Sequence, residues 1–158
     1  MSYTHNSDLE YYKKYPTDTN CGSFALQLKE WYTPEDKFEN EVGELYNWVE
    51  DMAESGYSEE EVSNFYLDAI KDQVLNDFQG EIEICDGRVP STKNKELIAL
   101  ATFCRWDEDI DWIDCDFHFK VFRDGRWQQK RGSGEVTDCN LEDWGDYISD
   151  VIFFYHKI

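Results

Sequence analysis

The chain has 158 residues with a formal net charge of −20, and 16% of its residues are aromatic. This length suits one ordinary domain, and the aromatic share argues against a chain that stays disordered. The negative charge excludes a protein that binds nucleic acid through non-specific phosphate contacts, because such binding needs Lys and Arg side chains. We therefore expect a single domain over residues 1–158.

Membrane insertion and disulfide bonding are not expected. No run of about 18 apolar residues occurs in the sequence, which predicts that the chain does not enter a membrane. The segment 1–16 lacks the apolar core of a signal peptide, so we expect a cytoplasmic protein, in the host cytoplasm if a phage encodes it. Five cysteines, an odd number without CxxC spacing, argue against a disulfide framework or a zinc ribbon. No cofactor is expected.

The first half of the chain, residues 17–79, has helical patterns and follows a lead-in at 1–16. The predicted helices run over about 21–31, 34–54 and 59–79. Ser58 and Glu61 match a capping box at the start of the third helix, because each side chain can accept from the other's free backbone N–H.

The second half, residues 80–158, changes to the two-residue period of strands. Strand-like segments lie at 82–84, at 96–106, at 117–131 as a hairpin, and at 151–155. The hairpin is indicated by Asp124-Gly125, a pair that suits a type I′ turn. The acidic stretch 107–116 is predicted to be a loop. Helices followed by strands predict an α+β fold, with N-terminal helices packed on a C-terminal antiparallel sheet.

Cys21 and His118 are the residues that best suit nucleophilic chemistry. Cys21 sits where a loop becomes a helix, so free backbone N–H groups and the helix dipole would favour its thiolate. His118 lies in the middle of the first hairpin strand and would be the general base that such a nucleophile needs. His5 and His156 lie near the chain ends and are expected at the surface.

A third group would orient the imidazole of His118. A two-residue turn pairs Arg123 with Arg126 and sets Gln129 opposite Lys120. Gln129 then lies on the same face as His118, one diagonal step away. Its amide oxygen could accept from the imidazole N–H, as an Asn does in papain-like enzymes.

Two further side chains extend this predicted site. Asp116 has the same strand parity as His118 and is the alternative orienting group. Asn20 could donate its side-chain or backbone N–H to an oxyanion. The candidate catalytic residues are therefore Cys21, His118, Gln129, Asp116 and Asn20.

These residues resemble a known family in their order along the chain. A helical Cys, a strand His and a polar residue on the next strand are similar to a minimal papain-like or NlpC-type cysteine hydrolase. The resemblance extends to a group of bacterial and phage proteins with an Asn-Cys helix start and later His, Asp-Gly-x-Trp and Lys-x-Gly. The matching residues here are Asn20-Cys21, Ala25-Leu26, His118, Asp124-Gly125-Arg126-Trp127 and Lys130-Arg131-Gly132.

The resemblance covers about residues 19–31 and 116–135. It implies a papain-like fold and a cysteine hydrolase or transferase that acts on an amide or thioester bond of a peptide or protein. Cys21 would be its nucleophile and His118 its general base. No Gln stands ahead of Cys21 as in papain, which leaves an inactive relative of the family as an alternative.

Two groupings resemble metal sites only in part. The aspartates of 107–116 do not match the Gly and Glu positions of an EF-hand loop, so a solvated acidic loop is the preferred interpretation. Cys104, Cys115 and His118 could bind zinc, but a fourth ligand is not evident. We therefore predict no metal.

Negative charge is concentrated in the segment 35–86, which holds 17 acids against Lys37 and Lys71. An acidic face of this kind would bind a basic partner with salt-dependent affinity. It supports a second function, a non-enzymatic acidic binding protein such as a phage-encoded, anti-CRISPR-like inhibitor of host defence, a DNA mimic or an immunity protein. Its predicted partner-binding residues are Glu39, Glu44, Asp51, Glu59 and Glu60.

Overall fold

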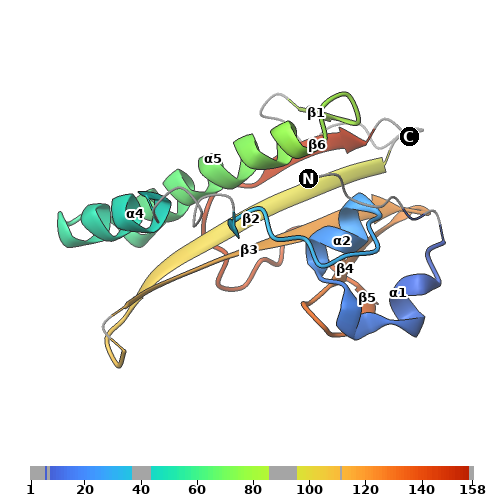
Figure 1. Cartoon of the computed structure of the whole chain (residues 1–158), viewed down its shortest axis with the longest axis horizontal. Coiled ribbons are helices and arrows are strands. Elements are labelled where there is room, and N and C mark those ends of the chain that lie inside the picture. Colours follow the sequence, from blue (N-terminus) through green and yellow to red (C-terminus); the bar gives the residue numbers. More distant parts are fainter. Residues whose placement is uncertain (1–5, 7, 37–43, 86–95, 111, 157–158) are drawn as a thin grey trace.

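The computed structural model describes residues 6, 8–36, 44–85, 96–110 and 112–156 (Figure 1). Within these ranges the helices are α1 (Tyr11–Lys14), α2 (Cys21–Leu26), α4 (Glu44–Glu54) and α5 (Glu59–Asp77), with a 3-10 turn η1 at Pro16–Asp18. The strands are β1 (Ile82–Ile84), β2 (Glu96–Asp107), β3 (Trp112–Arg123), β4 (Arg126–Lys130), β5 (Val136–Asp138) and β6 (Ile152–His156). None of the helices in this part of the chain is long and apolar enough to cross a membrane.

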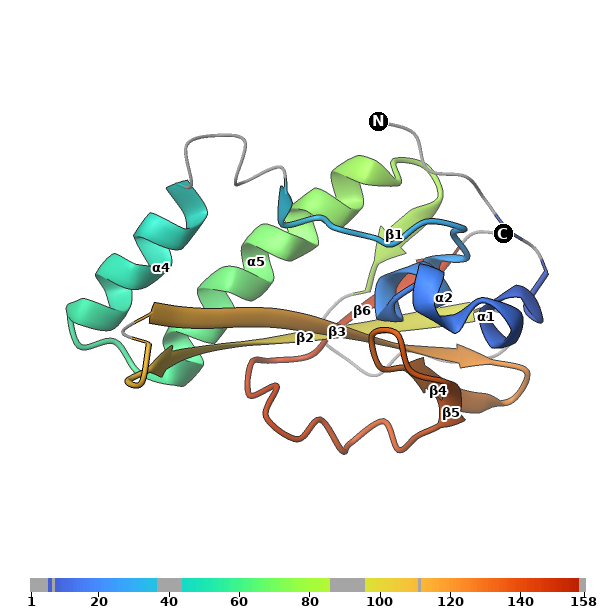
Figure 2. The same cartoon turned by 60° about the horizontal axis from the view of Figure 1, so that its bottom comes forward.

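The strands form one sheet in the order β1-β6-β2-β3-β4-β5. All of its strand pairings are antiparallel, which confirms the α+β prediction of helices followed by an antiparallel sheet. Helices α2, α4 and α5 lie on one side of the sheet, which we call the helix face (Figure 2). The segment 139–151, between β5 and β6, runs along the opposite side, which we call the loop face (Figure 2).

The prediction of an acidic loop at 107–116 is wrong, because most of this segment belongs to the long ribbon formed by β2 and β3. Asp107 pairs with Trp112, and the pairing continues without a break to Leu97 and Phe122. Buried Ile113 lies between exposed Trp112 and exposed Asp114, which is the two-residue period of a strand with one buried face. Asp114 and Asp116 occupy exposed positions of β3, so a run of acids here is compatible with a strand.

The predicted helices are confirmed in part. The helix that begins at Cys21 ends at Leu26, earlier than expected, because Gln27 takes a left-handed conformation with φ 58°. The helix predicted over 34–54 is confirmed from Glu44 onward, since 37–43 lie outside the described residues. The capping box of the third helix is present, with the Ser58 hydroxyl accepting from the Glu61 N–H at 3.1 Å.

His156 is not at the surface, contrary to expectation. It is buried on β6, with Nδ1 3.5 Å from Oε1 of Glu96, the first residue of β2. The same carboxylate oxygen accepts from the guanidinium of Arg123 at 2.6 Å. Although burial alone would raise the pKa of Glu96, these two partners lower it to about 2. Glu96 of β2 therefore links its two neighbouring strands, β6 through His156 and β3 through Arg123. The other terminal histidine, His5, lies outside the described residues.

Candidate active site

The β3–β4 hairpin has the predicted register. Lys120 pairs with Gln129 and Arg123 with Arg126. Asp124 and Gly125 between them have φ angles of 55° and 78°, the two left-handed residues that a type I′ turn requires. This register determines which side chains of β3 and β4 lie next to one another in the site.

Gln129 contacts His118 as the register predicted. The imidazole Nε2 lies 2.8 Å from Oε1 of Gln129. Because an amide oxygen only accepts hydrogen bonds, Nε2 carries the proton and Nδ1 of a neutral imidazole carries the lone pair. Burial, with the positive charges of Lys120 and Arg131, lowers the pKa of His118 to about 4, against the opposing effect of Gln129. His118 is therefore a neutral base near pH 7.

Cys21 is the first residue of α2, and its thiol is buried. Its Sγ lies 4.0 Å from the carbonyl oxygen of Phe117, within hydrogen-bonding range for sulfur. Burial and the nearby charges of Asp116 and Glu35 raise the pKa of Cys21 to about 12, although backbone amides of Phe119 and Gly22 act in the opposite direction. The expected thiolate is thus not favoured. Desolvation destabilises the anion more than the N–H groups and dipole at the start of this six-residue helix stabilise it.

The structure brings the predicted residues to one cavity of about 480 Å³. Its lining includes all five candidates: Asn20, Cys21, Asp116, His118 and Gln129. They come from the start of α2, the middle of β3 and the end of β4. Three separate stretches of the chain therefore meet there.

Cys21 and His118 reach this cavity from opposite faces of β3. Phe119, next to His118, packs on the helix face, with its ring centroid 6.3 Å from that of Tyr32. The His118 ring lies on the loop face, 5.4 Å from the ring of Tyr147. Among the described residues, β4 pairs with β3 only from Lys120 to Arg123, so the preceding part of β3 has a free edge on this side. The cavity extends around that edge, and the thiol hydrogen-bonds to the Phe117 carbonyl instead of the imidazole.

Asn20 and Asp116 have other partners. The Asn20 side chain donates to the Tyr32 carbonyl at 2.8 Å, and its backbone N–H donates to the Ser23 hydroxyl at 3.1 Å. An oxyanion would have to compete with these acceptors. Asp116 accepts from the Tyr147 hydroxyl at 3.0 Å. Of the two candidate orienting groups, only Gln129 is hydrogen-bonded to the imidazole of His118.

Two buried lysines of the hairpin, Lys120 and Lys130, hold the walls of the cavity, and the sequence patterns did not predict this role. The Lys130 ammonium donates to the backbone carbonyls of Pro16 and Thr19, just ahead of the Asn20-Cys21 helix start, and to that of Gly132 after β4. The Lys120 ammonium donates to the carbonyls of Asn140 and Asp143 and lies 4.3 Å from the centre of the Trp144 ring. For Lys120 a signal was present, because it stands inside the apolar strand run 117–122.

The remaining predicted residues lie elsewhere. Asp51, Glu59 and Glu60 are exposed on α4 and α5, whereas Glu39 and the side chain of Glu44 lie outside the described residues. No group of three or more His, Cys, Asp or Glu residues in the described part of the chain could hold a metal ion. The zinc alternative is wrong, because Cys104 and Cys115 share the helix face and His118 points to the loop face.

Comparisons with known proteins provide no relative. No family model, no curated protein and no solved structure matches the chain. The papain-like resemblance therefore stays a prediction.

Lys130→Met is expected to lower the free energy of unfolding by about 3 kcal/mol, because the buried carbonyl of Thr19 and the partly buried carbonyls of Pro16 and Gly132 lose this donor. Lys13→Met is the matched control. Lys13 is an exposed lysine 3.6 Å from Glu10, and its loss should cost less than about 0.5 kcal/mol. Urea unfolding followed by circular dichroism measures both. Equal stabilities of the two variants would contradict the structural role of Lys130.

Proposed function

We propose that the chain is a papain-like cysteine hydrolase or transferase that acts on an amide or thioester bond of a peptide or protein. The observation that carries the proposal is the cavity shared by Cys21 and His118, in which Gln129 fixes the imidazole with Nδ1 as the proton acceptor. Aromatic side chains in the same cavity supply apolar surface for a peptide. These are Trp31, Phe103, Phe117, Trp144 and Tyr147. The proposed activity belongs in the cytoplasm, the location expected from the sequence.

The proposed reaction starts from neutral groups. The Cys21 thiol turns from the Phe117 carbonyl around the free edge of β3 toward Nδ1 of His118, which takes its proton as the sulfur attacks the substrate carbonyl carbon. The resulting imidazolium gives that proton to the leaving amine or thiol, and an acyl-thioester remains on Cys21. Water, or an acceptor amine or thiol, then releases the acyl group. Because the thiol pKa is about 12, proton removal accompanies attack and no ion pair is formed beforehand.

Cys21→Ala should abolish cleavage of fluorogenic peptide amides and acyl thioesters. His118→Ala should lower kcat/KM at least a hundredfold, since general-base catalysis contributes roughly 10²–10⁴. In the wild-type protein kcat/KM should fall as the pH drops through about 4, because protonation of His118 removes the base. An unperturbed histidine would lose activity near pH 6.5.

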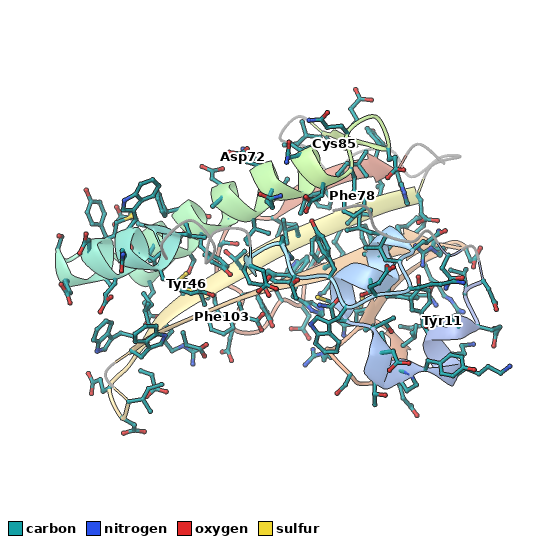
Figure 3. The ribbon with its side chains drawn as sticks, in the orientation of Figure 1. Tyr11, Tyr46, Asp72, Phe78, Cys85 and Phe103 are labelled. Carbon is teal, nitrogen blue, oxygen red and sulfur yellow. The ribbon has the colours of Figure 1, made fainter. Side chains whose placement is uncertain are left out.

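Cys85→Ala is the matched control. Cys85 follows β1, is partly exposed and does not line the cavity (Figure 3). It should retain wild-type activity. Turnover that survives Cys21→Ala would overturn the proposal, as would a folded wild-type protein without activity on either substrate class, the result expected of an inactive relative.

The acidic helices support the second candidate, a non-enzymatic acidic binding protein. Lys71 is the only cation between 44 and 85, and it already contacts Asp68 and Asp72, each at 3.4 Å. Other exposed acids on α4 and α5 are Asp51, Glu54, Glu59, Glu60 and Glu61. Figure 3 shows the Asp72 side chain on the outer side of α5. Trp48 and Tyr57 are 54% and 50% exposed beside these acids, and exposed aromatics are typical of partner interfaces.

Reversing Asp51, Glu59 and Glu60 to Lys should weaken binding of a lysine-rich peptide, and the affinity for the wild-type protein should fall steeply with salt. Fluorescence anisotropy at low and high salt measures both effects. Reversal of Glu108, Asp109 and Glu142, which are exposed acids outside α4 and α5, changes the net charge equally and is the control. Equal losses in the two triple variants would reject a specific acidic surface.

A further inference from the structure

Cys104 and Cys115 face each other across the β2–β3 ribbon. They are direct partners in the register, so both side chains point to the helix face. Their sulfur atoms lie 2.8 Å apart, closer than ordinary contact between two sulfurs and longer than the roughly 2.05 Å of a covalent S–S bond. Directly paired residues of an antiparallel sheet have Cα atoms about 4.5–5.5 Å apart, within the range that a disulfide spans.

The two thiols differ in access. Cys104 is 1% exposed and its backbone N–H donates to the Ser63 hydroxyl of α5 at 2.8 Å, so its place in the ribbon is fixed. Cys115 is partly exposed. A reagent in solution therefore reaches Cys115 first, and the buried sulfur of Cys104 lies 2.8 Å from that of Cys115.

We propose that Cys104 and Cys115 form a redox-active dithiol site that closes to a cross-strand disulfide by exchange with a small-molecule disulfide, with glutathione disulfide as the representative oxidant. The Cys115 thiolate attacks one sulfur of the oxidant and releases the first glutathione as a thiolate, which takes up a proton. The Cys104 sulfur then attacks Cys115 in the mixed disulfide and releases the second glutathione. The protein loses two electrons and two protons, and the oxidant is reduced to two thiols.

Burial affects the order and rate of these steps. Burial and the neighbouring Cys115 sulfur raise the pKa of Cys104, so its thiolate is scarce and the second step is the slower one. Proximity favours this step nevertheless, because the two sulfurs are already neighbours and need no backbone movement to meet.

The dithiol lies next to the cavity along the ribbon. The neighbouring pair in the register is Phe103 with Asp116, and both residues line the cavity. A bond between Cys104 and Cys115 would therefore fix the two strands beside the cavity and should raise Tm. The dithiol proposal does not depend on the function proposed for Cys21.

A tryptic digest tests the proposal, because Arg105 separates the two cysteines. Cleavage after Lys95, Arg105 and Lys120 gives peptides 96–105 and 106–120, each with one cysteine. The reduced full-length protein is incubated with glutathione disulfide, alkylated and digested without reductant. Mass spectrometry should find the two peptides joined, with complete loss of the pair after treatment with a reductant.

Single variants separate the steps. Cys104→Ser should stop at a stable glutathione adduct on Cys115, and Cys115→Ser should leave Cys104 unmodified. Cys85→Ser should form the joined peptides as the wild-type protein does. Separate peptides from the oxidised wild-type protein, whether free or carrying glutathione on Cys115, would overturn the proposal. Joining of the two peptides only in unfolded protein would also overturn it.

Discussion

Three cations of the β3–β4 hairpin lie inside the protein and bind backbone carbonyls of other segments. Lys130 donates to the segment before α2, Arg123 to the end of α2, and Lys120 to the segment before β6. A buried charge without partners is very unfavourable, and so is a buried carbonyl without a donor. Each cation removes both penalties at once. The segments on the two faces of the sheet are therefore positioned by the same five-residue strand and its neighbour.

This arrangement explains how a cavity forms at the edge of β3. One wall begins at Asn20-Cys21, directly after carbonyls that Lys130 binds. The other wall contains Trp144 and Tyr147, directly after a carbonyl that Lys120 binds. His118 is between them, and Gln129 of the hairpin fixes its ring. The hairpin thus holds both walls and the candidate base, while the thiol on α2 is positioned through its preceding segment.

Local sequence patterns predicted the hairpin, its register and the contact between Gln129 and His118. Asp124-Gly125 determined the turn, the turn determined the register, and the register placed Gln129 beside His118. The ammonium contacts of Lys130 could not be predicted from the sequence, because they join residues 111 and 114 positions apart and produce no periodic pattern. The prediction of a thiolate at Cys21 was wrong for a related reason. Burial depends on tertiary packing, and it decides the ionisation of this thiol more strongly than its place at a helix start does.

The chain separates its chemically distinct features along the sheet. Helix α4 lies over one end of the β2–β3 ribbon, α5 runs from there along the ribbon to β1, and α2 with the hairpin lies toward the end away from α4 (Figure 1). The cavity with Cys21 lies beside β3, and the Cys104–Cys115 pair is one residue along the ribbon from its Phe103–Asp116 lining. The acidic helices, the cavity and the cysteine pair therefore occur on one sheet without sharing side chains.

The most direct test of this account is a ¹H–¹⁵N correlation spectrum of the lysine ammonium groups at neutral pH. Burial lowers the pKa values of Lys120 and Lys130, but carbonyl-bound ammonium groups should stay protonated and exchange slowly with water. The account predicts two protected signals, one lost in Lys120→Met and the other in Lys130→Met. A spectrum without protected ammonium signals would contradict the claim that buried lysines hold the walls of the cavity.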